Sequence, residues 1–146
     1  MWWIREYLGK NHLGRPNIFE VIDSKNLEFS GITLKNSPYY HHHWKRVENV
    51  HFHDFEIFVD IWSQLTLGDL FFGIDANAVS DDNGFSFRVP SYPLNTDGID
   101  PEGRNILIER VNITNYDDAV AVKPLQADHH ELKCTENVMV RDIIVH

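Results

Sequence analysis

The chain has 146 residues, of which 42% are hydrophobic, and its 13 lysines and arginines face 22 aspartates and glutamates, a formal net charge of −9. The length fits one domain, and no basic stripe is present to neutralise phosphates, which argues against a nucleic-acid partner. No apolar run approaches the roughly 20 residues of a membrane-spanning helix, so no membrane partner is expected. Protonation of all nine histidines would bring the formal charge to zero, which predicts that acidic pH removes repulsion from an anionic polymer.

Four segments repeat the pattern asparagine, apolar, x, apolar, x, x, apolar, x, apolar, over residues 26–34, 49–57, 105–113 and 137–145. Each contains two short alternating runs with a polar break between them, which is typical of strands that turn a corner with one face inward. The starts are 23, 56 and 32 residues apart, and a repeat of this kind predicts a parallel β-solenoid. The longest interval has room for one less regular coil between about Trp62 and Pro90, so we expect about five coils.

The asparagine that opens each repeat has two interpretations. Stacked asparagines can form an internal ladder in which each side-chain amide bonds the rungs above and below. Asparagine also favours turns before strands without any ladder. Both alternatives stay open at this point.

Neither end of the chain has the features of a solenoid cap. The start, Met1-Trp2-Trp3-Ile4-Arg5, lacks the pattern of a secretory signal peptide, and a strand pattern is still running at His146. We therefore expect residues 1–146 to be a single partial β-helix domain that lacks N-terminal coils with their cap, and C-terminal coils. Such open ends expose unpaired backbone groups and apolar faces, which predicts self-association.

Two acidic motifs, Asn95-Thr96-Asp97-Gly98 and Tyr116-Asp117-Asp118-Ala119, are separated by twenty to twenty-one residues. Because one coil takes about 20 to 28 residues and neighbouring rungs lie about 4.8 Å apart, this spacing predicts that Asp97, Asp117 and Asp118 share one patch of surface. Crowded carboxylates cannot all ionise cheaply, so one of them can remain an acid beside an ionised partner. The alternative is that these aspartates are ordinary turn residues.

The stretches Pro93 to Pro101, Asn105 to Ile108 and Asn115 to Lys123 resemble the central region of glycoside hydrolase family 28, the polygalacturonases, and are most similar to fungal exopolygalacturonases. The similarity extends upstream through Trp2-Trp3, Arg15-Pro16 and Gly31 to Pro38. It implies a right-handed parallel β-helix and inverting hydrolysis of the α-1,4-galacturonosyl bonds of pectin, without cofactor or metal. It also implies that Asp117 is the general acid, while Asp97 and Asp118 hold and activate water.

The sequence departs from the family pattern beyond the paired aspartates. The glycine-flanked segment that often carries histidine and the Arg-Ile-Lys motif that binds the galacturonate carboxylate are both missing. Asn95 and Lys123 are the candidate substrate-binding residues, although a lysine that ends a strand is often only solvated. We therefore expect an enzyme as the parent protein and little or no turnover from this chain.

Other residues suggest chemistry that we do not expect. The histidines His41, His42, His43, His51 and His53 resemble a metal site, but consecutive side chains of an extended segment point to alternate faces, so no metal is expected. His51 and His53 are expected to share the outer face of one strand. The run Asp81 to Gly84 is expected to be a loop. Trp2, Trp3, Tyr39, Tyr40 and Trp44 are expected to pack in the core or at corners rather than to stack on sugars.

Two alternative functions stay open. A related pectin-backbone hydrolase, such as a rhamnogalacturonase or xylogalacturonan hydrolase, would use the same carboxylates. A non-catalytic carbohydrate-binding or residual β-solenoid would bind without cleaving. The resemblance implies a secreted parent protein, although we expect no signal peptide in this chain.

Overall fold

The computed structural model describes residues 14–61, 93–126 and 132–146. The chain divides into two compact units, and the unit formed by Arg15–Val59 and Leu94–His146 contains every described strand. That unit is described here by itself. The expected coil at Trp62–Pro90, the expected loop at Asp81–Gly84 and the tryptophans Trp2 and Trp3 lie outside the described residues, and the single partial domain stays a prediction.

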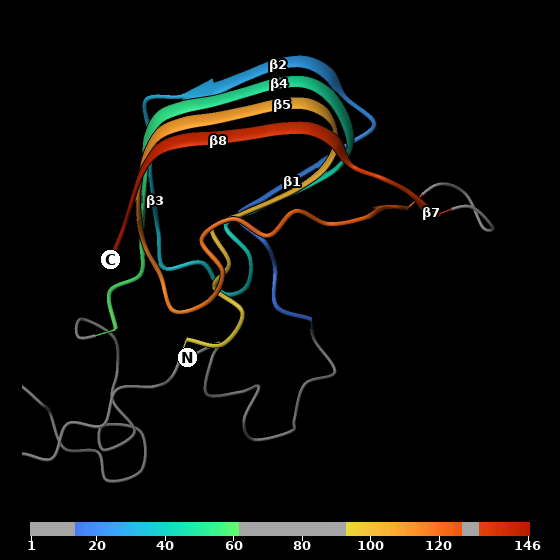
Figure 1. Cartoon of the computed structure of the whole chain (residues 1–146). Coiled ribbons are helices and arrows are strands. Elements are labelled where there is room, and N and C mark those ends of the chain that lie inside the picture. Colours follow the sequence, from blue (N-terminus) through green and yellow to red (C-terminus); the bar gives the residue numbers. More distant parts are fainter. Residues whose placement is uncertain (1–13, 62–92, 127–131) are drawn as a thin grey trace, which may run out of the picture. The chain divides into compact units, whose positions relative to one another are not determined.

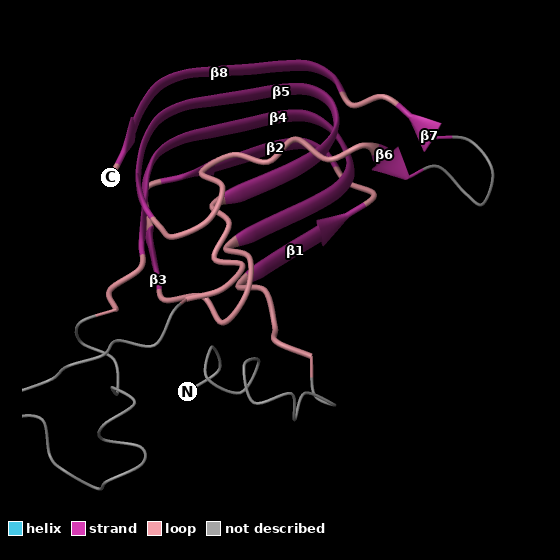
Figure 2. Cartoon of the chain, turned by 60° about the horizontal axis from the view of Figure 1, so that its bottom comes forward, coloured by secondary structure: helices cyan, strands magenta, loops and turns pink. Residues whose placement is uncertain are grey.

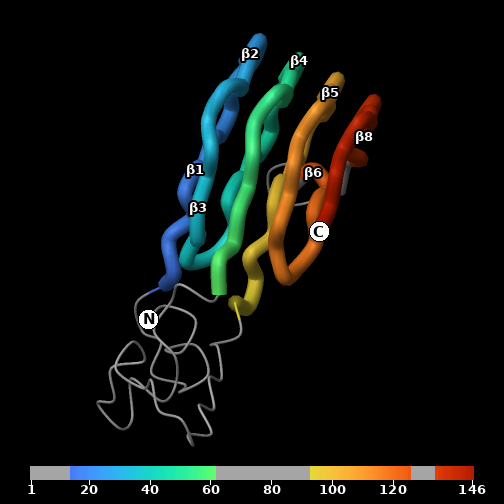
Figure 3. Tube along the Cα trace, turned by 90° about the vertical axis from the view of Figure 1, so that its left-hand side faces the viewer, coloured from blue at the N-terminus to red at the C-terminus, as the bar shows by residue number. Residues whose placement is uncertain are grey.

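The strands of this unit form a parallel β-helix, as predicted. Strands β1 (Phe19–Ile22), β2 (Lys25–Ser30) and β3 (Thr33–Lys35) all pair in parallel with the long bent strand β4 (His42–Phe58). Strand β4 pairs in parallel with β5 (Ile99–Thr114), and β5 with β8 (Glu136–Val145). The short strands β6 (Leu125–Gln126) and β7 (Leu132–Lys133) form a separate antiparallel pair. Figures 1 and 2 show the coils stacked as layers, and Figure 3 shows the same layers edge-on.

The register places equivalent repeat positions above one another. Leu27 pairs with Val50, Val50 with Ile106, and Ile106 with Val138, so the described residues contribute four successive rungs to this stack. Strand β4 bonds directly to β5 along nearly its whole length. The long interval between the second and third repeats therefore does not insert a coil between these two strands.

The core lies inside the coils and is built by the alternation seen in the sequence. Phe52, Ile57, Ile108 and Ile113 are completely buried, and buried residues alternate with more exposed ones along much of β4 and the later part of β5, with breaks at the corners. Burial of each such side chain contributes about 1.5 to 3 kcal/mol of hydrophobic free energy. Trp44 is 3% exposed and packs edge-on against Phe52 with ring centroids 4.6 Å apart, which confirms its predicted packing role.

The asparagines of the four repeats form a ladder at one corner of the coils. Asn49 Nδ2 donates to Asn26 Oδ1 at 2.9 Å, Asn105 Nδ2 to Asn49 Oδ1 at 3.0 Å, and Asn137 Nδ2 to Asn105 Oδ1 at 3.0 Å. All four residues have φ between 55° and 57°, a left-handed conformation that asparagine tolerates. The asparagines therefore form the ladder of the first interpretation, although it lies at an exposed corner and not inside the solenoid.

Strand β8 ends the described stack and carries exposed apolar side chains. Met139, Val140, Ile144 and Val145 are 45–60% exposed. The partners of Val140 and Val145 in β5, Ile108 and Ile113, are buried. No helix among residues 14–61, 93–126 and 132–146 is long and apolar enough to cross a membrane.

Candidate active site

The three aspartates of the acidic motifs meet at one edge of the coils. Asp97 lies just before β5, and Asp117 and Asp118 lie in the loop that follows the end of the same strand. One carboxylate oxygen from each residue lies within 4.8 Å of those of the other two. The structure therefore brings together the three residues that the spacing of the motifs placed on one patch.

Backbone hydrogen bonds around Gly98 hold the two acidic motifs side by side. Gly98 N donates to Asp118 O at 2.9 Å and Ile99 N to Ala119 O at 3.1 Å, so the loop after β5 runs alongside the start of that strand. A Cβ at position 98 would lie 2.4 Å from Ala119 O. Only glycine permits this approach, which explains its place directly after Asp97.

Two asparagines fix the loops that carry the carboxylates. Asn95 has φ 55° and donates its backbone N–H to Asp117 Oδ2 at 3.1 Å. Asn115 Nδ2 donates to Thr96 O at 3.2 Å and to Asp118 O at 2.9 Å, so one side chain joins both motifs. Asn95 therefore lies at the cluster, and its role in substrate binding stays a prediction. The linking role of Asn115 was not predicted.

The carboxylates differ in environment. Asp97 is 4% exposed, whereas Asp117 and Asp118 are exposed. Burial raises the pKa of Asp97, the charge of Asp117 raises it further, and the ammonium of Lys123 opposes both. Lys123 Nζ lies 3.6 Å from Asp97 Oδ2, which places the predicted lysine at the cluster. Within the described ranges, these three aspartates are the one group of histidine, cysteine or acidic residues close enough to hold a metal ion.

A fourth carboxylate, Asp100, lies behind the cluster and was not predicted as a site residue. It is completely buried, and its Oδ2 lies 3.2 Å from Lys123 Nζ. Burial and the charge of Asp97 together raise the pKa of Asp100 to about 7, against the opposing charge of Lys123. The sequence could have indicated Asp100, because it follows Asp97 by three residues and lies at the start of β5, still close to the cluster.

Arg15 is a second residue that sequence reasoning missed. Its Nη2 donates to Asn95 Oδ1 at 2.7 Å, and its Nη1 donates to the backbone carbonyls of Leu94 and Pro38. Its guanidinium also lies 4.5 Å from the ring centroid of Tyr39. Arg15 thereby holds the first acidic motif from a distant part of the chain, a contact that no local pattern indicates.

The adjacent tyrosines lie between two cations. The Tyr39 and Tyr40 rings stack with centroids 3.9 Å apart, and Lys123 Nζ lies 5.4 Å from the Tyr40 centroid. Both rings are half-buried, and they pack on one another as expected of corner residues.

The histidines beneath the site correct the expected charge balance. His41 and His42 are fully buried, and burial lowers their pKa values to about 4 and about 3. They stay neutral at moderately acidic pH, so these two do not contribute to the positive charge that protonation of all nine histidines would supply. His42 instead acts as an aromatic core residue, whose Nδ1 accepts a hydrogen bond from Trp44 Nε1 at 3.1 Å.

His51 and His53 lie on the outer face of β4, as predicted. Their ring centroids are 4.2 Å apart. His51 Nε2 lies 3.0 Å from Glu109 Oε1 and His53 Nε2 lies 2.9 Å from Glu28 Oε1. Each ring is thus engaged by a carboxylate of a neighbouring rung.

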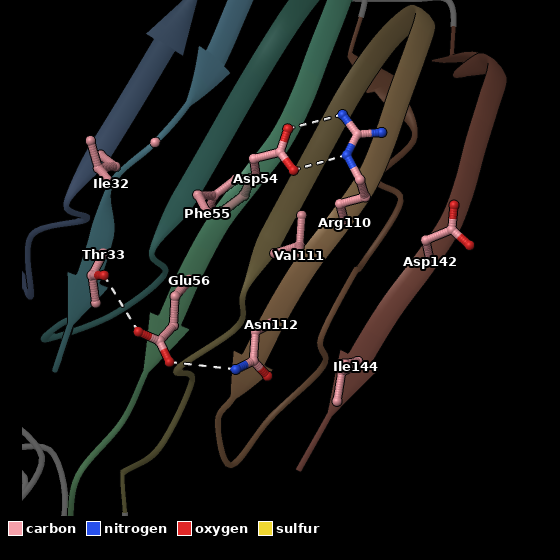
Figure 4. Close-up of a pocket in the computed structure, with 11 residues that line it drawn as sticks. Ile32, Thr33, Asp54, Phe55, Glu56, Arg110, Val111, Asn112, Asp142 and Ile144 are labelled. Carbon is pink, nitrogen blue, oxygen red and sulfur yellow. Dashed lines mark hydrogen bonds and ion pairs between the residues drawn. The ribbon is translucent and has the colours of Figure 1, made fainter.

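A separate open groove of about 580 Å³ lies on the outer surface of β3, β4, β5 and β8. Figure 4 shows Arg110 facing Asp54, while Glu56 lies between Thr33 and Asn112. Arg110 donates Nε and Nη2 to the two oxygens of Asp54 at 2.8 and 3.0 Å. None of the clustered aspartates lines this groove, so it is not part of the candidate active site.

A parallel β-helix with carboxylates aligned at the edge of its coils has the acid and base groups that glycoside hydrolysis requires. The chain matches the family model of the glycosyl hydrolases family 28 over residues 1–141. It is 32% identical over 124 residues to a probable polygalacturonase of Vitis vinifera, an alignment that covers 84% of this chain and 19% of that protein. No solved structure was found to match. The chain therefore belongs to the glycosyl hydrolases family 28, and it spans about a fifth of the length of this curated relative.

Proposed function

We propose that the parent protein is a polygalacturonase that hydrolyses α-1,4-galacturonosyl bonds of pectin outside the cell, with inversion and from the chain end. The observation that supports this most strongly is the approach of Asp97, Asp117 and Asp118 to within 4.8 Å of one another. Family membership and the similarity to a probable polygalacturonase support the substrate class.

In this mechanism Asp117 protonates the leaving oxygen, while Asp97 and Asp118 hold and activate the attacking water. The exposure of Asp117 supports its role, since the leaving oxygen must reach it from solvent. The raised pKa of Asp97 favours a second assignment, in which Asp97 holds the proton and acts as the acid. A substrate with a good leaving group, such as 4-nitrophenyl galacturonide, distinguishes the two assignments. Its leaving group needs little protonation, so replacement of the general acid should slow its hydrolysis less than replacement of the other aspartate.

Inversion is proposed from the resemblance and not from the carboxylate spacing. Two-carboxylate inverting enzymes separate these groups by about 6.5 to 9.5 Å, and retaining enzymes by about 5 to 5.5 Å. The nearest oxygens of this cluster are closer than either range. Proton NMR of the first product formed gives the anomeric configuration directly, and retention would contradict the proposed mechanism.

Asn95 and Lys123 are proposed to bind the substrate. The Lys123 side chain is 34% exposed, and its ammonium has three donors, so it can face Asp97 and Asp100 and still reach a galacturonate carboxylate. Replacement of Lys123 by Gln should therefore weaken binding of polygalacturonate more than binding of its neutral methyl ester.

The decisive variant is Asp117→Asn, which keeps shape and removes acid function. Reducing-sugar release from polygalacturonate at pH about 4 to 6, however slow, should fall by about 10² to 10⁴-fold. Asp142→Asn is the matched control, because Asp142 is an exposed corner residue of β8 and should leave release unchanged. Unchanged release in Asp117→Asn would overturn the proposal.

The same assay separates the alternatives. Release from rhamnogalacturonan or xylogalacturonan, with none from polygalacturonate, would indicate a related pectin-backbone hydrolase. Binding of oligogalacturonate without release would indicate a non-catalytic carbohydrate-binding solenoid.

A further inference from the structure

The Lys123 ammonium lies between two buried carboxylates of unequal accessibility. Its Nζ is 3.2 Å from Asp100 Oδ2 and 3.6 Å from Asp97 Oδ2. Asp100 is completely buried behind the cluster, whereas Asp97 belongs to the carboxylate patch itself. A small movement of one side chain therefore decides which of the two carboxylates receives the charge of the lysine.

The backbone of Lys123 is fixed although its side chain has this freedom. Lys123 N donates to Pro101 O at 3.0 Å and Ala121 N to Ile99 O at 3.0 Å, which lays the segment along the start of β5. Apart from the Lys123 ammonium, no residue that the structure describes donates a hydrogen bond to either oxygen of Asp100. Lys123 is thus the cation that offsets a buried carboxylate, whose isolated burial would cost several kcal/mol.

We propose that Asp100 is a positioning residue, which holds the Lys123 ammonium to itself when ionised and releases it toward Asp97 and the substrate when protonated. This inference rests on the proposed function of the carboxylate cluster. It goes beyond that function because it gives a role to a residue outside the cluster and predicts how the site responds to pH.

The groups that face Asp100 come from three parts of the fold. These are Asp97 and Asp118 of the cluster, Lys123 of the segment that follows it, and Tyr40 and His43 at and just before the start of β4. Burial raises the pKa of Tyr40 above its usual range and lowers that of His43, so both are neutral near pH 7. Because the pKa of Asp100 is about 7, its ionisation is the charge change expected here between pH 6 and 8.

The direction of the pH response follows from these charges. Below pH 7, Asp100 is neutral and the Lys123 ammonium interacts mainly with Asp97. Its charge favours the ionised form of Asp97, which activates water. Above pH 7, ionised Asp100 competes for the same cation, and the substrate carboxylate loses part of its attraction. The site is therefore expected to bind an anionic sugar better in acid.

Carbon NMR of the Lys123 Cε and the Asp97 Cγ tests the coupling in the full chain without any turnover. Both signals should show an inflection near pH 7 in the wild-type protein and in the control Asp142→Asn, and Asp100→Asn should abolish it. An absent inflection in the wild type, or one that persists in Asp100→Asn, would overturn the proposal.

A second variant keeps the test decisive should Asp100→Asn fail to fold. In Lys123→Gln the inflection of the Asp100 Cγ signal should move to higher pH, because Lys123 is the group that lowers the pKa of Asp100. An unmoved inflection would show that Lys123 and Asp100 are not coupled.

Binding of trigalacturonate separates this proposal from the proposed function. Between pH 5 and pH 8 its affinity for the wild-type chain should fall about tenfold, as for loss of one charge-assisted contact, and should fall less in Asp100→Asn. Coupled NMR inflections without trigalacturonate binding would leave the positioning role intact and overturn the function. Binding with equal pH dependence in both proteins would overturn the positioning role alone.

Discussion

The asparagine corner and the acidic cluster each bring residues of the same kind together at turns of the chain, with opposite consequences. At the asparagine corner, three amide hydrogen bonds of 2.9 to 3.0 Å join four rungs. An amide is both donor and acceptor, so a column of identical asparagines satisfies itself. This corner needs no partner from elsewhere in the fold.

The acidic cluster is not self-complementary in this way. Ionised carboxylates only accept hydrogen bonds and repel each other, so Asp97, Asp117 and Asp118 depend on donors from other segments. The Lys123 ammonium and the N–H of Asn95 supply them. The difference teaches that a stack which satisfies itself stabilises the fold, whereas a stack of like charges is a candidate for chemistry.

Gly98→Ala should have the largest effect on stability and turnover of the variants compared, because it disturbs the acidic cluster and leaves the asparagine corner in place. Its Cβ would lie 2.4 Å from Ala119 O, so the two motifs must separate. We expect a loss of about 1 to 3 kcal/mol in unfolding free energy and about 10²-fold in the proposed turnover. Thermal denaturation and reducing-sugar release measure the two effects.

Gly31→Asn is the matched control for that substitution. Gly31 has φ 72°, a Cβ at this position would meet no atom within 4 Å, and asparagine tolerates a positive φ. Equal destabilisation by both variants would show that glycine at position 98 has no special role.

His42→Phe tests the rung beneath the acidic cluster, where His42 N donates to Gly98 O at 3.1 Å. Burial lowers the pKa of His42 in the folded chain to about 3. At a pH below the pKa of the unfolded chain, the unfolded chain therefore binds more protons than the folded chain, and stability is lost as pH falls toward 3. Phenylalanine should remove this loss, about 3 kcal/mol at pH 4. Denaturant unfolding at pH 7 and pH 4 measures the difference.

His53→Gln provides a control of opposite sign. Asp54 and Glu28 raise the pKa of His53, so its contribution to stability is present in acid and is lost as pH rises through the folded pKa. The variant should therefore lose stability at low pH and not at high pH. The same acid response in both variants would contradict this interpretation of burial and pairing.

Asn105→Leu tests the asparagine corner itself, since Asn105 bonds the rungs on both sides. Leucine removes two hydrogen bonds and adopts a φ of 55° poorly, so we expect a loss of about 1 to 3 kcal/mol. Asn105→Gly keeps the backbone conformation and removes only the hydrogen bonds, so it should cost less. Thermal denaturation compares them, and identical costs would mean that backbone conformation contributes nothing.

The smallest expected effect is on the last rung of the described stack. Met139 and Ile144 of β8 are 57% and 60% exposed, and exposed apolar strand edges favour association between chains. The double variant Met139→Lys, Ile144→Lys should weaken self-association and change stability by about 0.5 kcal/mol or less. Sedimentation over a range of concentrations measures it, and a wild-type chain that stays monomeric throughout would contradict the predicted association.

Much of the fold was predictable because its signals are local. Alternating apolar residues and the repeated asparagine indicated parallel coils, and the spacing of the two acidic motifs indicated that their aspartates meet. The side chains of Arg15, Asp100 and Asn115 were not recognised. Arg15 bonds Asn95 from 80 positions away, and no periodicity within either segment indicates that contact.

The sequence by itself determined the coil, its corners and which carboxylates come level, because each depends on residue types at short, regular intervals. Tertiary structure alone decided the charge of the site. Burial keeps His41 and His42 neutral and raises the pKa of Asp100. The fold also places the Lys123 ammonium between Asp97 and Asp100. Ionisation depends on every neighbour that replaces water around a group, and those neighbours come from coils that only the folded chain brings together.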